Sequence, residues 1–64
     1  MNELTKLFLD YQGKKIFVHL NSGRKYETSN FQIVDDVYAV FNDKFNLRVT
    51  IRLSEILRIE EVRN

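Results

Sequence analysis

The feature that most constrains the fold is an alternation of apolar and polar residues over residues 45–53, FNLRVTIRL. Its apolar side chains occupy every second position: Phe45, Leu47, Val49, Ile51 and Leu53. A period of two is typical of a strand with one face in the core and the other in water. The stretch therefore predicts a long strand over residues 45–53.

A second short strand is predicted directly after this one. Ser54 and Glu55 form an expected tight turn, and the apolar-rich segment ILRI follows at residues 56–59. A long strand that bends into a short one, in a chain of 64 residues, favours a small closed or nearly closed barrel.

The start of the chain predicts a short amphipathic helix over about residues 2–12. Asn2 can cap this helix, and Glu3 suits its first turn. Apolar residues follow at the spacing i, i+3, i+4 and i+7, namely Leu4, Leu7, Phe8 and Tyr11. Gly13 is placed to end the helix in a left-handed conformation. Because so short a helix is marginal alone, its apolar face is expected to pack on the barrel.

The middle of the chain predicts three further strands. Residues 15–20 alternate with Ile16, Val18 and Leu20 facing inward, and the hairpin turn 21–23 follows. In the next strand, about residues 24–34, the apolar residues do not all fall on alternate positions. This irregularity predicts a bulge or strong bend around residues 28–30. Asp35 and Asp36 then form a turn before a compact apolar strand at residues 37–41, and residues 42–44 turn again. The predicted order is one helix and five strands.

The length of 64 residues and the lack of cysteine limit what the chain can be. We expect one domain, residues 1–64, near the lower size limit for independent folding. No disulfide can brace it, and one histidine is too few for a usual zinc site. Burial between identical subunits is therefore an expected source of stability.

The net charge of +1 and the residue pattern exclude several classes of function. The charge is too small to hold nucleic acid by itself, so any such binding depends on local arrangement. No apolar run is long enough for a membrane span and no signal peptide is recognisable, so we expect a cytoplasmic protein. The serines have no partner set for nucleophilic catalysis, and Gly13 and Gly23 make no phosphate loop. We expect neither enzymatic activity nor a cofactor.

Two segments resemble the motifs of the Sm-like family, which includes the Sm and LSm proteins and bacterial Hfq. The first segment runs from residue 20 to residue 35, and its matching positions are Leu20, Gly23, Ser29, Phe31, Val34 and Asp35. The second is IRLSEILRI at residues 51–59. The resemblance implies a mainly β fold, a strongly bent five-stranded antiparallel SH3-like barrel over about residues 15–62, after the helix. It also implies a homo-hexameric or homo-heptameric ring, in which strand four of one subunit pairs with strand five of the next.

The same resemblance implies a site for single-stranded RNA. Its candidate residues are Arg52, Tyr38, Val37, Arg48 and Ser54. Arg52 matches the arginine of the second motif, while Val37 occupies the stacking position and Ala39 the place of the family asparagine. Tyr38 stacks on a base if the register moves by one, although an aromatic in a short apolar strand is more often core. The alternative for Arg52 is a solvated strand arginine paired with an acid.

The resemblance thus implies a non-catalytic RNA-binding protein of the Sm or Hfq kind, acting as a ring. The rival function is a protein-interaction or scaffold module on the same barrel, which the low net charge and the alanine at position 39 favour. Phe17 and His19 share one parity and form either an aromatic patch, a surface under the helix or part of a subunit interface.

Overall fold

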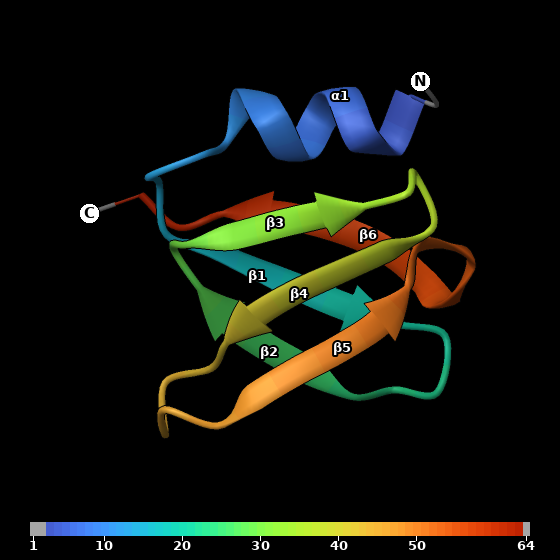
Figure 1. Cartoon of the computed structure of the whole chain (residues 1–64). Coiled ribbons are helices and arrows are strands. Elements are labelled where there is room, and N and C mark those ends of the chain that lie inside the picture. The colour runs from blue at the N-terminus through green and yellow to red at the C-terminus, as the bar shows by residue number, and fades with distance from the viewer. Residues whose placement is uncertain (1–2, 64) are drawn as a thin grey trace.

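A computed structural model describes residues 3–63 and shows a mainly β fold with one N-terminal helix (Figure 1). Six strands form two three-stranded antiparallel sheets, in the orders β2-β1-β6 and β3-β4-β5. The elements are α1 (Glu3–Asp10), β1 (Ile16–Leu20), β2 (Lys25–Thr28), β3 (Phe31–Val34), β4 (Tyr38–Asn42), β5 (Arg48–Arg52), the 3-10 turn η1 (Leu53–Glu55) and β6 (Ile56–Glu61). No helix within residues 3–63 is long and apolar enough to cross a membrane.

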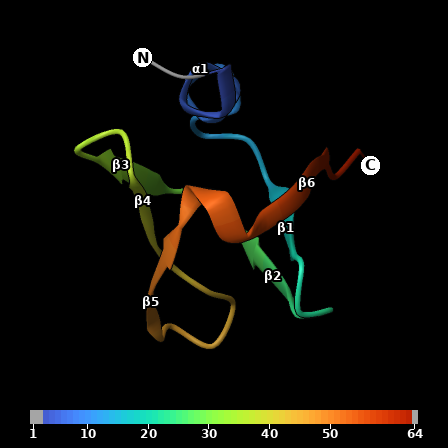
Figure 2. The same ribbon diagram turned by 90° about the vertical axis from the view of Figure 1, so that its right-hand side faces the viewer.

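The two sheets lie on opposite sides of the molecule with α1 above them (Figure 2). The prediction of a mainly β chain after a helix is confirmed, but the strand count is not five. The single bent strand predicted at residues 24–34 is two strands, β2 and β3, which belong to different sheets. Among the described residues the sheets remain separate three-stranded units in an open arrangement.

The bend between β2 and β3 is closed by Thr28. Its hydroxyl donates to the carbonyl oxygen of Asn30 at 3.1 Å and accepts from the amide of Asn30 at 3.4 Å. Thr28 is buried, so these bonds satisfy a hydroxyl that would otherwise lack partners. The bend predicted around residues 28–30 is confirmed, and it moves the chain from one sheet to the other.

The predicted turns at residues 21–23 and at Asp35–Asp36 are also confirmed. Gly23 has a φ of +93°, and its amide donates to the carbonyl of Leu20 at 3.0 Å. Asp35 and Asp36 have φ values of +54° and +59°. Two successive positive φ values match the twist of a tight hairpin, and aspartate tolerates them better than most residues.

The prediction of a strand over residues 45–53 is wrong for its first three residues and for Leu53, which begins η1. β5 begins at Arg48, and Phe45 and Leu47 are 71% and 62% exposed in the preceding loop. The carboxylate of Asp43 accepts the amides of Phe45 and Leu47 at 2.9 and 3.0 Å, and Asn46 has a φ of +62°. These local bonds compete with strand pairing and convert the start of the alternation into a loop.

The core lies between the sheets and under α1. Its buried apolar side chains are Phe8, Ile16, Val18, Leu20, Phe31, Ala39, Phe41, Ile51 and Leu53. Phe8 is fully buried and meets the ring of Phe31 edge to face, with 4.9 Å between centroids. The inward faces predicted for residues 16–20 and for residues 49–53 are therefore confirmed.

The helix ends two residues earlier than predicted, and three of the four residues predicted on its packed face, Leu4, Phe8 and Tyr11, do pack on the core. α1 ends at Asp10, and its expected cap, Asn2, lies outside the described residues. Thr5 is buried, whereas Leu7, expected on the packed face, is 46% exposed. The Thr5 hydroxyl donates to the carboxylate of Asp36, and this tertiary bond turns Thr5 toward the 35–36 hairpin.

Replacing Phe8 tests whether α1 is part of the core. Phe8→Ala should lower the free energy of unfolding by about 3–5 kcal/mol, because it removes a buried ring and leaves a cavity. Urea denaturation at one fixed chain concentration measures this. The exposed Leu9 on the same helix is the control, and Leu9→Ala should change stability by less than about 0.5 kcal/mol. Equal midpoints for the two variants would show that the helix does not pack on the sheets.

Replacing Asp43 tests the loop before β5. Asp43→Ala removes the acceptor of two backbone amides and should destabilise the protein by about 1 kcal/mol. It should also speed hydrogen exchange at the amides of Phe45 and Leu47, which NMR can follow. Asp43→Asn keeps a side-chain carbonyl and should retain most of the protection. Unchanged exchange in Asp43→Ala would contradict the role of the carboxylate.

Candidate nucleic-acid interface

Arg52 is the last residue of β5 and lies opposite Tyr38 of β4 in the antiparallel ladder. The guanidinium carbon is 6.0 Å from the centroid of the Tyr38 ring, and Arg52 is exposed. None of the ion pairs within residues 3–63 includes Arg52. Arg52 is therefore a solvated strand arginine, as the alternative expected, but without the expected ion pair in this part of the chain.

Arg52 borders a shallow hollow of about 350 Å³. The start of α1, the 35–37 turn and η1 contribute the other lining residues, which are Leu4, Asp36, Val37, Leu53 and Ser54. The amide of Leu53 donates to the carbonyl of Val37 at 2.8 Å and holds two of these segments together. Three of the five residues predicted as a site, Arg52, Val37 and Ser54, therefore line one hollow, and Tyr38 adjoins it.

The groups in this hollow differ in chemistry. Arg52 offers a planar set of N–H donors that can bond a phosphate or a base edge and can stack on a base. Val37 is exposed and adds apolar surface, whereas Ser54 adds a hydroxyl. Asp36 already accepts the Thr5 hydroxyl, and its carboxylate also suits an amino group better than a phosphate. The hollow therefore combines one guanidinium, one carboxylate, an apolar surface and a hydroxyl.

Arg48 does not belong to this hollow. It begins β5, opposite Asn42, and the register places it four residues from Arg52. At roughly 3.3 Å per residue, the two arginines start about 13 Å apart along the strand. Tyr38 is half-buried and lies opposite Arg52 in the ladder. The structure thus separates the five candidates into a group at the η1 end of β5 and Arg48 at the other end.

Phe17 and His19 lie on the outer face of the first sheet. The ammonium of Lys25 is 4.5 Å from the centroid of the Phe17 ring, and His19 contacts the carboxylate of Glu60 through Nε2. Arg58 also reaches Glu60, at 3.4 Å. This face is therefore an interconnected group of charged and aromatic side chains that joins β1 to β6, and both of its rings have partners within the chain.

The alternation in residues 45–53 places Phe45 on the core face of a strand, so the sequence predicts no exposed loop and no site at residues 43–47. The available signal was Asp43, since aspartate two residues before a candidate strand can bond the backbone and delay the strand. Within residues 3–63, no group of three His, Cys, Asp or Glu side chains is placed to hold a metal ion.

Comparisons of the chain with protein-family models, with curated proteins and with solved structures each found no match. The family resemblance of the two sequence motifs stays a prediction, and the function has to be argued from the residues.

Proposed function

We propose that this chain is an RNA-binding protein of the Sm or Hfq kind that holds single-stranded RNA without chemistry on it. The observation that carries the proposal is Arg52, an exposed cation without an ion pair in the described chain, at the edge of a hollow and beside Tyr38. A guanidinium next to an aromatic ring suits the phosphates and bases of a single strand. The proposed location of this function is the cytoplasm.

In this proposal, each of the five predicted site residues has a distinct role. Arg52 bonds a phosphate or a base edge, and Val37 provides the apolar surface against which a base rests. Ser54 donates or accepts one hydrogen bond, and Tyr38 positions the guanidinium from the neighbouring strand. Arg48 contacts the RNA at a point separate from Arg52.

We further propose that the chain closes into a homo-hexameric or homo-heptameric ring of bent five-stranded Sm-like barrels, with β2 and β3 counted as one strand. Support comes from β5 and β6, which each pair with only one neighbour among the described residues. An unpaired strand edge attracts another strand. β5 carries Arg48 and Arg52, whereas β6 carries Arg58 together with Glu60 and Glu61, so the two edges differ in the sign of their net charge. A ring would repeat Arg52 once per subunit and concentrate positive potential.

The second candidate function is a protein-interaction module on the same fold. It is favoured by several large apolar side chains that remain exposed: Leu7, Leu9, Val34, Val37, Phe45, Leu47 and Leu57. Such residues are typical anchors for a protein partner. Salt distinguishes the two functions, because contacts with phosphates release counterions and weaken steeply as salt rises.

The first test of RNA binding is Arg52→Ala. The variant should bind fluorescent single-stranded RNA at least about tenfold more weakly, since a hydrogen bond to a charged group contributes about 1.5–3 kcal/mol. Fluorescence anisotropy at several salt concentrations measures the affinity. Arg63→Ala is the matched control, because Arg63 is an exposed arginine far from the hollow in sequence and its loss changes the net charge equally. Equal affinities for wild type and Arg52→Ala would remove this site.

The ring is tested by the absolute mass of the purified, nuclease-treated protein, measured by light scattering. The expected mass is that of six or seven chains, and Arg52→Ala should leave it unchanged, because edge pairing uses backbone groups. A monomeric mass would contradict the ring, and salt-insensitive capture of a protein partner by such a monomer would favour the interaction module.

A further inference from the structure

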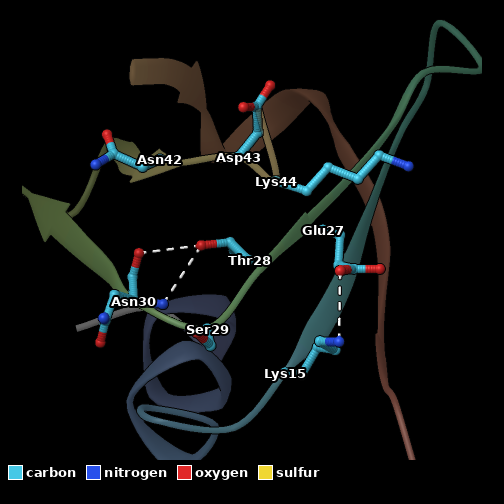
Figure 3. A pocket seen from close by; sticks show the side chains of 8 residues that line it. All are labelled: Lys15, Glu27, Thr28, Ser29, Asn30, Asn42, Asp43 and Lys44. Atoms are coloured by element: carbon cyan, nitrogen blue, oxygen red, sulfur yellow. Dashed lines mark hydrogen bonds and ion pairs between the residues drawn. The ribbon is translucent and has the colours of Figure 1, made fainter. Parts of the chain in front are cut away.

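A second polar hollow, of about 290 Å³, lies at the end of β5 away from Arg52 (Figure 3). It is formed where the bend after β2 faces the loop after β4. Its lining residues are Lys15, Glu27, Thr28, Ser29, Asn30, Asn42, Asp43 and Lys44. Asn30 and Asn42 also line an adjacent hollow that contains Gln12, Gln32 and Arg48. The two hollows therefore meet at a pair of asparagines.

The amide groups at this junction are available to a ligand. Asn30 and Asn42 are exposed, and within residues 3–63 no hydrogen bond occupies either side-chain amide. An amide carries both donors and an acceptor, the combination that matches a nucleobase edge. Gln12 and Gln32 add two more amides in the adjacent hollow.

The lining of the two hollows carries one more cation than acid, with Lys15, Lys44 and Arg48 against Glu27 and Asp43. Glu27 pairs with Lys15 at 3.6 Å, and the Asp43 carboxylate accepts two backbone amides. Neither Lys44 nor Arg48 belongs to any ion pair within residues 3–63. Two unpaired cations on either side of Asn42 favour an anionic ligand.

Phe45 adds an aromatic surface to the same end of the molecule. Phe45 is 71% exposed, and the ammonium of Lys44 lies 5.2 Å from the centroid of its ring. The bonds from Asp43 hold the loop in place, so the exposed ring is presented on an ordered support. Bases stack on such aromatic side chains with little preference for sequence.

We propose that this end of the molecule, comprising Phe45, Lys44, Arg48, Asn30 and Asn42, is a second contact site for single-stranded RNA. A base stacks on Phe45, the neighbouring phosphates lie near Lys44 and Arg48, and the two asparagines bond base edges. The inference rests on the proposed RNA-binding function and adds to it a contact separate from Arg52. A protein partner would use Leu47 as readily as Phe45, because both are exposed on one loop. The free cations and amides favour RNA instead.

Paired variants of the full chain test this site by anisotropy with a fluorescent single-stranded RNA. Phe45→Ala should weaken binding about fivefold or more, the loss expected for one stacked base. Leu47→Ala removes a similar exposed apolar side chain from the same loop and should leave the affinity unchanged. Lys44→Gln should reduce the slope of log affinity against log salt by about 0.7, whereas Lys6→Gln, an equal charge change on α1, should not.

Crosslinking locates the contact independently of these variants. RNA crosslinked to the wild-type protein by ultraviolet light, followed by trypsin and mass spectrometry, should modify the peptide of residues 45–48. Crosslinks confined to the peptide of residues 49–52 would overturn the second site. Near-ultraviolet circular dichroism and urea denaturation confirm that each variant is folded.

The outcomes separate this inference from the proposed function. A wild-type protein that binds no RNA overturns both. If Arg52→Ala weakens RNA binding and Phe45→Ala does not, the second site alone is overturned. Equal losses in Phe45→Ala and Leu47→Ala, together with a smaller mass in light scattering, would show that the loop contacts another copy of the chain, and would also overturn it.

Discussion

The structure depends on one short bend, which the buried hydroxyl of Thr28 closes onto Asn30. Without it, β2 and β3 would continue as one strand of a single flat sheet. With it, the chain crosses to a second sheet, and the apolar faces of both sheets can bury each other. The same bend anchors the end of the helical segment, because the Ser29 carbonyl accepts the amide of Gly13 at 3.2 Å. The core under Phe8 follows from this arrangement.

The two ends of β5 lie in different chemical environments, because different segments of the chain surround them. Near Arg52, the hairpin at Asp36 and the turn η1 provide an apolar and hydroxyl surface. Near Arg48, the bend and the loop after β4 provide amides and a second cation. Because the strand is extended, a single stretch of five residues spaces these two environments about 13 Å apart. The proposed ligand, an extended single strand of RNA, would contact both ends.

The alternation in residues 45–53 shows where a local sequence pattern predicts the structure correctly and where it does not. Its second half is correct, since Ile51 and Leu53 are buried and Val49 is partly buried. Its first half fails because the Asp43 carboxylate binds two backbone amides that a strand would need. The predicted face of the helix fails at Leu7 alone, while the polar Thr5 is buried and bonds Asp36. Both errors involve polar side chains that bond the backbone or another element.

The sequence by itself determined the helix followed by strands, the turns at Gly23 and at Asp35–Asp36, and the inward faces of β1 and of most of β5. These features depend on periodicity and on backbone conformations that few residues tolerate, both of which are local. Only the tertiary structure decided that β2 and β3 belong to different sheets, that Arg52 adjoins Val37 and Ser54, and that Phe45 faces water. Those features depend on contacts between distant segments, which no local pattern encodes.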